Sequence, residues 1–436
     1  MKVLKFGGTS VGSAKRIKKV AALLSNDEKK IVVLSAMSGT TNSLVEIANY
    51  LFEKKNELAS DLIEGLRAKY LKVASELYTK ENFLQKGKDL IASHFDHLLS
   101  FTQDSFTIHE EKAVLAQGEL ISTALFQLYL EELGQASALL PALQFMRIDK
   151  DLEPDSFYIK ENLHRLIGAD QTTNIFITQG FICRNVYGEV DNLKRGGSDY
   201  TASLIGVALK VDEIQIWTDI DGMHNNDPRY VKDTKPIGQL SFDEAAELAY
   251  FGAKILHPTS VLPAKKANIP VRLKSTLNPE NEGTLITSNS AKGGIKAIAA
   301  KDGLTAIKIK SGRMLLAYGF LRKVFEIFEL YKTSIDMITT SEVAVSVTID
   351  DLTHIDAIQK ELQNYGYVQL DKEQTIVCVV GDFREKYKGV ALSVMEALKH
   401  IPLRMISYGG SNHNISLLIN TAHKEEALKS LNNLFA

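Results

Sequence analysis

Two short segments of the chain combine a glycine pair with a cation and hydroxyl groups. They are residues 5–10 (KFGGTS) and residues 194–201 (KRGGSDYT). Glycine has no Cβ, so its backbone N–H can approach an anion, and a following helix directs its positive end at the same point. Two such segments indicate substrates with several negative charges. The residues concerned are Lys5, Gly7, Gly8, Thr9 and Ser10 in the first segment and Arg195, Ser198 and Asp199 in the second.

The first segment differs from two common nucleotide-binding loops. A P-loop places its lysine after the glycines, in GxxxxGK[ST], whereas Lys5 precedes Gly7. The spacing of Gly7, Gly8 and Gly12 also differs from the dinucleotide pattern GxGxxG. A glycine pair followed by hydroxyls is, by itself, equally compatible with a plain tight turn. The elements around the segment therefore have to decide between a turn and an anion site.

Those elements favour an anion site. Apolar residues recur at positions 17, 20, 21 and 24, which predicts a helix beginning near Ser13, a good N-cap residue. Residues 30–36 are typical of a buried parallel strand. A strand, glycine turn, helix and strand form a βαβ unit, in which the start of the helix faces the ligand-binding edge of the sheet.

Composition is that of an ordinary globular protein. The 436 residues are 45% hydrophobic and 24% charged, enough for two or three domains. A net charge of −2 gives no support for nucleic-acid or membrane-surface binding, and we expect no membrane span. Because a strand begins by Val3, we expect no signal peptide and a cytoplasmic protein. Cys183 and Cys378 lie in apolar runs and are expected to be reduced core thiols.

The order of the predicted elements indicates three regions. We predict an α/β catalytic domain at residues 1–290, with a helical insertion at about 43–133 and a polar linker at 278–294. Residues 304–372 have the order β-α-β-β-α-β, which residues 373–436 repeat with one strand missing. Residues 295–303 supply a spare strand. We therefore predict that the first of two ferredoxin-like modules (304–372) is inserted in the second (295–303 and 373–436).

Five motifs in this order resemble those of the aspartate kinases, which belong to the amino acid kinase family and carry tandem ACT domains. The motifs are residues 5–10 (KFGGTS), 117–119 (QGE), 195–201 (RGGSDYT), 217–219 (WTD) and 251–258 (FGAKILHP). The resemblance covers essentially the whole chain and implies a mostly parallel sheet sandwiched by helices, followed by two ACT modules. Because the chain ends after the second module, it resembles the monofunctional type. Its resemblance to the lysine-sensitive type is carried by residues of the first ACT module.

The resemblance implies a reaction between two anions. The γ-phosphoryl group of MgATP passes to the side-chain carboxylate of L-aspartate, giving 4-phospho-L-aspartate and ADP, the first step of lysine, threonine and methionine biosynthesis. Two unit charges about 4 Å apart repel by about 4 kcal/mol at an effective dielectric near 20, so positioning and cations must dominate catalysis. Lys5 is the implied catalytic cation and Asp199 its orienting partner. The alternatives are a strand-end surface lysine and a helix N-terminal carboxylate.

The resemblance also implies the binding residues. Arg195 suits the α-carboxylate through two parallel N–H bonds, and Glu119 suits the ammonium, although a helix-surface glutamate is the alternative. The implied aspartate-binding residues are Ser35, Thr41, Glu119, Arg195 and Ser198; the implied ATP-binding residues are Lys5, Gly7, Gly8, Thr9, Ser10, Thr218, Asp219, His224, Arg229 and Lys254. Mg²⁺ would be held mostly by phosphates and water, and no structural metal is expected.

The ACT modules imply regulation by an amino-acid effector, and lysine is favoured over threonine or the absence of an effector. The matching residues are Met314, Gly319, Phe320, Leu321, Ser334, Ile335, Asp336, Thr340, Ser341 and Glu342. Asp336 and Glu342 suit the amino groups of lysine, whereas Phe320, Leu321 and Ile335 also suit ordinary helix-on-sheet packing. Exposed edges of ACT sheets predict a homodimer or a dimer of dimers.

Departures from the family pattern leave alternatives open. His224 stands where relatives often have tyrosine, Lys194 replaces a common glycine, and Ala317 stands where lysine-sensitive relatives have serine. A kinase of the same fold that acts on glutamate, carbamate or a nucleotide is the nearest alternative function. A catalytically weak amino-acid sensor is the second, and the presence of Lys5 and Asp199 disfavours it.

Overall fold

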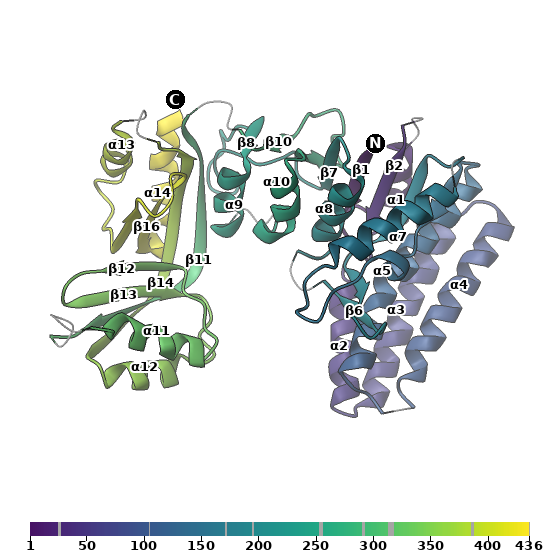
Figure 1. Cartoon of the computed structure of the whole chain (residues 1–436), viewed down its shortest axis with the longest axis horizontal. Coiled ribbons are helices and arrows are strands. Elements are labelled where there is room, and N and C mark those ends of the chain that lie inside the picture. Colours follow the sequence, from purple (N-terminus) through teal and green to yellow (C-terminus); the bar gives the residue numbers. More distant parts are fainter. Residues whose placement is uncertain are drawn as a thin grey trace. The chain divides into compact units, whose positions relative to one another are not determined.

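The computed structural model divides into two compact units, each described by itself (Figure 1). Unit 1 comprises Met1–Met223, Gly238–Phe242 and Ile255–Asn289, and unit 2 comprises His224–Ile237, Asp243–Lys254 and Ser290–Ala436. Two segments of the predicted catalytic domain therefore belong to unit 2 by contact. The residues that the structure describes are 1–24, 28–103, 105–170, 172–193, 196–252, 256–289, 293–312, 318–384 and 388–435.

Unit 1 is built on an eight-stranded sheet with the order β3-β4-β2-β1-β7-β9-β10-β8. In this order, neighbouring strands are parallel to one another from β3 at the edge of the sheet to β9, and β10 is antiparallel to β9. All five residues of β2 are buried, as the apolar sequence predicted. The strands are β1 (Lys2–Phe6), β2 (Lys30–Leu34), β3 (Ser137–Leu139), β4 (Ile175–Gln179), β7 (Glu213–Thr218), β8 (Gln239–Ser241), β9 (Val271–Ser275) and β10 (Thr284–Thr287), with a separate hairpin of β5 (Ile182–Arg184) and β6 (Val190–Asn192).

Helices supply the second layer, and the long ones form the predicted insertion (Figure 1). The first helix begins where its N-cap predicted, because the Ser13 side chain accepts from the Arg16 N–H. The helices are α1 (Ala14–Ala22), α2 (Thr40–Phe52), α3 (Asn56–Leu77), α4 (Glu81–Ser100), α5 (Ile108–Glu132), α6 (Ala142–Phe145), α7 (Ser156–Ala169), α8 (Gly197–Leu209), the 3₁₀ turn Pro258–Val261 and α10 (Leu262–Ala267). Helix α9 (Phe242–Tyr250) belongs to unit 2 except for its first residue.

Helix α5 differs from the expectation that no segment could span a membrane. By length and composition alone it passes that test, and it is the one helix in the described part of the chain to do so. However, 78% of its apolar window is buried, and Val114, Leu125 and Phe126 belong to the hydrophobic core of unit 1. Such burial is typical of the core helix of a globular domain.

The predicted linker at residues 278–294 is wrong in its central part, because Thr284–Thr287 form β10, which pairs with both β8 and β9. Only Thr284 and Ile286 of this strand are buried, and four alternating residues are too short a signal to stand out in a polar stretch. Gly283 allows the chain to pass close to β9: it has a φ of +72°, and a Cβ there would lie 1.8 Å from the Leu273 carbonyl oxygen.

Unit 2 contains a six-stranded sheet with the order β12-β13-β11-β14-β16-β15. The two central strands, β11 and β14, are long and antiparallel. Helices pack on each half of the sheet and form a separate hydrophobic core there. The strands are β11 (Gly294–Lys310), β12 (Met337–Thr340), β13 (Ala344–Ile349), β14 (Tyr367–Asp382), β15 (Met405–Tyr408) and β16 (Asn414–Asn420), and the helices are α11 (Phe320–Leu330), α12 (Ile355–Gln363), α13 (Val390–Ala397) and α14 (Lys424–Asn432).

The spare strand predicted within residues 295–303 and the first strand of the module that begins at residue 304 are one continuous strand, β11, with an irregularity in register between Lys301 and Leu304. Gly303, with a φ of +79°, supplies the left-handed conformation there. Each half of the sheet has its own core, one around Val324 and Ile358 and the other around Val394 and Leu428. Cys183 and Cys378, expected to be core thiols, are buried and free.

Candidate active site

The carboxyl ends of four neighbouring parallel strands meet at one edge of the sheet in unit 1. The register places Phe6, the last residue of β1, beside Leu34 of β2 and Trp217 of β7, and Leu34 beside Gln179 of β4. The loops that follow these strands therefore lie together. Open α/β sheets bind their ligands at this edge, so the first glycine segment and the loop after β2 are in the expected place.

The structure brings Lys5 and Asp199 into direct contact. The Lys5 Nζ lies 2.7 Å from the Asp199 Oδ1, and their side chains are only 13% and 14% exposed. Lys5 comes from the end of β1 and Asp199 from the first turn of α8, where the helix dipole favours a negative charge. Because an ammonium has three donors, Lys5 keeps N–H groups for a further anion while Asp199 fixes its position.

The glycine segment is packed tightly against both neighbouring strands. A Cβ on Gly8 would lie 2.8 Å from the Ala36 carbonyl oxygen, so only glycine allows this approach. The Gly8 carbonyl accepts from the Ser38 N–H at 3.1 Å. The Gly7 N–H donates to the Trp217 carbonyl at 3.3 Å, so this donor holds the loop against β7.

A second cluster contains three of the residues expected to bind aspartate, Ser35, Ser198 and Glu119. The Ser35 hydroxyl donates to the Ser198 hydroxyl at 2.9 Å, and the Ser122 hydroxyl donates to the Ser35 carbonyl at 2.9 Å. Glu119 Oε1 accepts from the Ala36 N–H at 3.2 Å. These contacts join the loop after β2 to the start of α8 and the middle of α5.

Glu119 is buried rather than on the helix surface. It is 4% exposed, and its Oε2 has no hydrogen-bond partner in the described structure. Burial raises the pKa of this carboxyl to about 7. A buried carboxylate oxygen without a partner is costly, so the site is suited to a ligand that brings a donor or a positive charge.

Two close-packed glycines were not identified from the sequence as site residues. A Cβ on Gly180, in the turn after β4, would lie 2.3 Å from the Ser198 hydroxyl oxygen. A Cβ on Gly118 would lie 2.7 Å from the Ala36 Cβ. Gly118 stands inside the QGE motif, which offered a signal, whereas nothing in the sequence separates Gly180 from an ordinary turn glycine.

The predicted nucleotide-binding residues of unit 1 line the same edge. The Ser10 hydroxyl is buried, 3.5 Å from the hydroxyl of Thr276, which donates to the Thr218 carbonyl at 2.9 Å. The Thr218 hydroxyl donates to Asp219 Oδ1 at 3.1 Å. The Thr9 carbonyl accepts from the Arg16 guanidinium. Thr276 was not identified from the sequence; its hydroxyl links the glycine segment after β1 to the end of β7.

Thr41 is placed differently from its neighbour. Thr41 is exposed in the first turn of α2, whereas Thr40 is buried with its hydroxyl 3.0 Å from the Tyr70 hydroxyl. The carbonyl of Ser38 in the same loop accepts from the Lys69 ammonium at 2.8 Å. The loop is therefore fixed by the helical insertion, and Thr41 remains accessible to a ligand.

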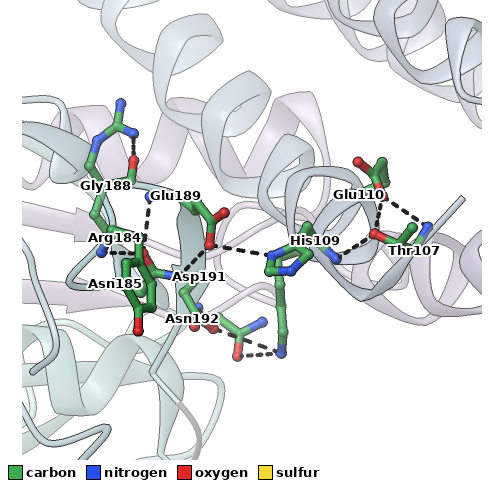
Figure 2. Close-up of polar contacts among 11 residues, drawn as sticks. Thr107, His109, Glu110, Arg184, Asn185, Gly188, Glu189, Asp191 and Asn192 are labelled. Atoms are coloured by element: carbon green, nitrogen blue, oxygen red, sulfur yellow. Dashed lines mark hydrogen bonds and ion pairs between the residues drawn. The ribbon is translucent and has the colours of Figure 1, made fainter. Parts of the chain in front are cut away.

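The strand that leads toward Arg195 is attached to the start of α5 (Figure 2). His109 Nδ1 lies 3.3 Å from Glu189 Oε2, and the Lys112 Nζ lies 3.5 Å from Asn192 Oδ1 at the end of β6. Helix α5 itself begins with a capping box. The helix that carries Glu119 is thus also attached to the β5–β6 hairpin, which precedes the second glycine segment in the sequence.

Some predicted site residues cannot be placed in this edge. Arg195, Lys254 and Met314 lie outside the described residues, as do Lys194 and Ala317. His224 and Arg229 belong to unit 2. There, His224 Nδ1 lies 2.9 Å from the Thr234 hydroxyl oxygen, and the 76% exposed Arg229 forms a two-pronged pair with Asp227.

Of the predicted effector residues that the structure describes, Asp336 has the most specific contacts. Its Oδ1 accepts from the Tyr250 hydroxyl at 3.0 Å and from the Lys301 ammonium at 2.6 Å, and its Oδ2 has no partner in the described structure. Phe320 is buried in the module core, so packing explains its type. Gly319 caps α11 with a φ of +81°, Ile335 is half-buried, and the exposed residues are Leu321, Ser334, Thr340, Ser341 and Glu342.

Comparison with known proteins supports this architecture. The sequence pattern of the amino acid kinase family matches residues 1–275, and that of an ACT domain matches residues 377–435. Lysine-sensitive aspartokinase 3 of Escherichia coli (strain K12) is 33% identical over 458 residues, covering 99% of each chain. Crystal structures of E. coli aspartokinase III with aspartate and ADP (R-state), and with lysine and aspartate (T-state), are 32% identical, have TM-scores of 0.82 and 0.83, and cover 100% of each chain.

A parallel sheet with an ion-paired lysine at its glycine-rich edge, followed by paired ferredoxin-like modules, defines the class as an amino acid kinase with an ACT region. The chain belongs to the aspartokinase family. The family resemblance and the fold class inferred from the sequence are thereby confirmed.

Proposed function

We propose that the protein is an aspartate kinase, which transfers the γ-phosphoryl group of ATP to the side-chain carboxylate of L-aspartate. The observation that carries this proposal is the enclosed Lys5–Asp199 pair next to the cluster of Ser35, Ser198 and Glu119. The product, 4-phospho-L-aspartate, serves lysine, threonine and methionine biosynthesis.

The Lys5 ammonium reduces the repulsion between the two anionic substrates, which is the main obstacle to the reaction. A carboxylate oxygen of aspartate forms a bond to the γ-phosphorus while the bond to the bridging oxygen breaks and its electron pair leaves with ADP. The Lys5 ammonium, held by Asp199, offsets the negative charge on the transferred group and the leaving oxygen.

Substrate recognition is assigned to the remaining residues. We infer that the unpartnered Oε2 of Glu119 receives the ammonium of aspartate and that Arg195 binds its α-carboxylate. Ser35, Thr41 and Ser198 add hydroxyl contacts. The ATP-binding set inferred from the sequence is Lys5, Gly7, Gly8, Thr9, Ser10, Thr218, Asp219, His224, Arg229 and Lys254.

We infer that Mg²⁺ accompanies ATP and is held by phosphate oxygens and water. The described residues contain no group of three or more His, Cys, Asp or Glu able to hold a metal, and Asp199 is already paired with Lys5. This donor set suits an ion bound mainly by its nucleotide. When bound, Mg²⁺ neutralises charge on the β- and γ-phosphates.

We further infer that lysine, rather than threonine, is the feedback effector and that it binds the first ACT module at residues 304–372. Asp336, buried with one unpartnered oxygen, suits an ammonium group. The second module then comprises residues 295–303 and 373–436, and the catalytic domain residues 1–290.

We expect the protein to act in the cytoplasm as a homodimer or a dimer of dimers, without nucleic-acid or membrane partners. Strands β12 and β15 lie close to each other in the folded chain and carry the exposed apolar side chains of Ile338 and Ile406, and this surface suits contact with a second copy. Sedimentation velocity across a range of protein concentrations tests this, and a monomer at every concentration would contradict it.

The catalytic proposal is tested by trapping the acyl phosphate with hydroxylamine, in the presence of MgATP and either L-aspartate or L-glutamate. We expect product with aspartate only. Lys5→Met should lower kcat by about 100- to 1,000-fold or more, because a donor aimed at developing charge is lost. Lys15→Met, at an exposed position of α1, is the matched control. Product with neither acid, or with glutamate at the same rate, would refute the proposal.

A further inference from the structure

The buried carboxylate of Asp336 already holds a cation that belongs to the protein. The Lys301 Nζ lies 2.6 Å from Asp336 Oδ1 and 2.9 Å from Asp350 Oδ2, and the Asp336 side chain is only 2% exposed. The Tyr250 hydroxyl donates to the same Oδ1 at 3.0 Å. Burial, followed by the charge of Asp336, raises the pKa of Tyr250 to about 12, so this hydroxyl keeps its proton and remains a donor.

The backbone around Lys301 is fixed by its neighbours, whereas its side chain can pair with either of two carboxylates, those of Asp336 and Asp350. Lys301 is the last residue of β11 before the irregularity in register, and its neighbour Asp302 is held by the Lys424 ammonium at 2.5 Å and the Thr375 hydroxyl at 2.8 Å. Asp350, in contrast to Asp336, is 46% exposed. The Lys301 ammonium can therefore leave Asp336 and remain paired with Asp350.

Exchange of one ammonium for another at Asp336 leaves the charge balance of the buried site unchanged. Removing Lys301 without a replacement would leave an uncompensated buried carboxylate, which is strongly unfavourable. The free Oδ2 of Asp336 offers an arriving ammonium a second acceptor that Lys301 does not use. A cationic amino acid is thus the ligand class that can replace Lys301.

Asp336 is also connected to a segment of the catalytic sequence. Tyr250 is the last residue of α9, and a Cβ on Gly252 would lie 2.3 Å from the carbonyl oxygen of Ala300, the residue before Lys301. The end of α9 is therefore packed on β11 and hydrogen-bonded to Asp336. The motif that follows α9, residues 251–258, contains the inferred ATP contact Lys254.

We propose that Lys301 is a built-in competitor of the lysine effector: the ammonium of the bound amino acid replaces Lys301 on Asp336, and Tyr250 passes the change to the end of α9. This inference rests on the proposed feedback inhibition by lysine. Lys301 then sets the affinity for the effector, and Tyr250 sets how strongly binding inhibits.

The first test measures lysine binding by titration calorimetry, together with inhibition of acyl-phosphate formation. If Lys301 occupies Asp336 for roughly nine-tenths of the time, removing it tightens lysine binding about tenfold. Lys301→Met should therefore lower both the Kd and the half-inhibitory concentration. Lys301→Arg, which keeps a competing cation, should not. Lys308→Met, at another lysine of β11, is the control and should match the parent protein.

The second test separates binding from its consequence. Tyr250→Phe should keep uninhibited activity and bind lysine, but with weaker inhibition at saturation, whereas Tyr367→Phe, at a 68% exposed tyrosine of β14, should not differ from the parent protein. If folded Lys301→Met bound lysine with unchanged or weaker affinity, the proposal that Lys301 competes with the effector would be wrong. If neither the parent nor Lys301→Met bound lysine, the inference would fall together with lysine regulation. Activity without lysine would still report on the proposed kinase function.

Discussion

At the scale of single residues, the sequence was a better guide to which residues belong to the site than to how deeply each of them is buried. Lys5 and Asp199 were named because a glycine pair with flanking charge predicts an anion site, and they do meet, at 2.7 Å. From the sequence alone, Glu119 could also have been an exposed residue on the surface of its helix. Its burial depends on the loop after β2 closing over α5 with Ala36 against Gly118, a contact between segments far apart in the chain. Periodicity within one helix does not report such a contact.

The burial of Glu119 leads to a prediction about pH. Its pKa is raised to about 7 from an ordinary value of 4.5, so the folded protein without substrate keeps a proton there that the unfolded chain releases. Only the ionised form attracts the ammonium of aspartate. We therefore expect the KM for aspartate to fall as pH rises from about 6 to about 8, and Glu119→Gln to raise KM and remove this dependence.

The same pKa predicts the sign of a stability effect. A folded state that binds more protons than the unfolded chain loses stability as pH rises, here between about 4.5 and about 7. In urea unfolding, Glu119→Gln should therefore gain stability relative to the parent protein across this range. Glu57→Gln, at an exposed position of α3, is the control. Equal pH profiles for the parent and Glu119→Gln, in both KM and unfolding, would show that Glu119 is not a buried titrating group.

At the scale of elements, the site depends on how closely the turn after β4 approaches the start of α8. The Cβ of an alanine at position 180 would lie 2.3 Å from the Ser198 hydroxyl oxygen, which must then move away from Ser35. Overpacking of this kind typically costs about 1–3 kcal/mol. We expect Gly180→Ala to lower kcat/KM for aspartate by at least about tenfold, an effect well above the loss of folded protein.

The control for this change is Gly168→Ala in α7. No atom lies within 4 Å of the Cβ position of Gly168, and helix propensity favours alanine by about 1 kcal/mol. Gly168→Ala should therefore keep activity and match or exceed the parent protein in thermal stability. If Gly180→Ala retained full kcat/KM, Ser198 would not need its present position, and its inferred contact with aspartate would be wrong.

Elements with a strong hydrophobic periodicity were predicted well. A short strand, β10, and a strand that continues from one predicted module into the other, β11, were not. The helical insertion and the strands of the parallel sheet follow from apolar runs and 3.6-residue repeats. Strand β10 was taken for a linker because its four residues depend on pairing with β8 and β9 for their place. The separate strands predicted on either side of Lys301 are one strand, since sequence shows the irregularity but not the pairing that continues across it.

At the scale of the whole molecule, the chain combines a candidate catalytic site in unit 1 with a predicted effector site in unit 2. The repeat of β-α-β-β-α-β order was visible in the sequence, whereas the membership of His224–Ile237 and Asp243–Lys254 in unit 2 was not. These two segments have contacts that only the folded chain reveals. In the first, the Asn225 carbonyl accepts from the Ile298 N–H, and the Asn226 side chain donates to the Leu428 carbonyl. In the second, Glu247 Oε2 accepts from the Asn414 side chain.

Two sites on one molecule must be coupled reciprocally if lysine inhibits by changing substrate affinity. The factor by which saturating lysine weakens binding of MgADP must equal the factor by which saturating MgADP weakens binding of lysine, and such factors are typically about 5 to 150. We expect equal factors from calorimetric titrations in both directions, with L-aspartate present at one fixed concentration throughout. In Tyr250→Phe both factors should move toward one together, because this change acts on the shared coupling. If the two factors agreed with each other but stayed near one in the parent protein while lysine still lowered kcat, inhibition would act on the phosphoryl-transfer step and not on nucleotide binding.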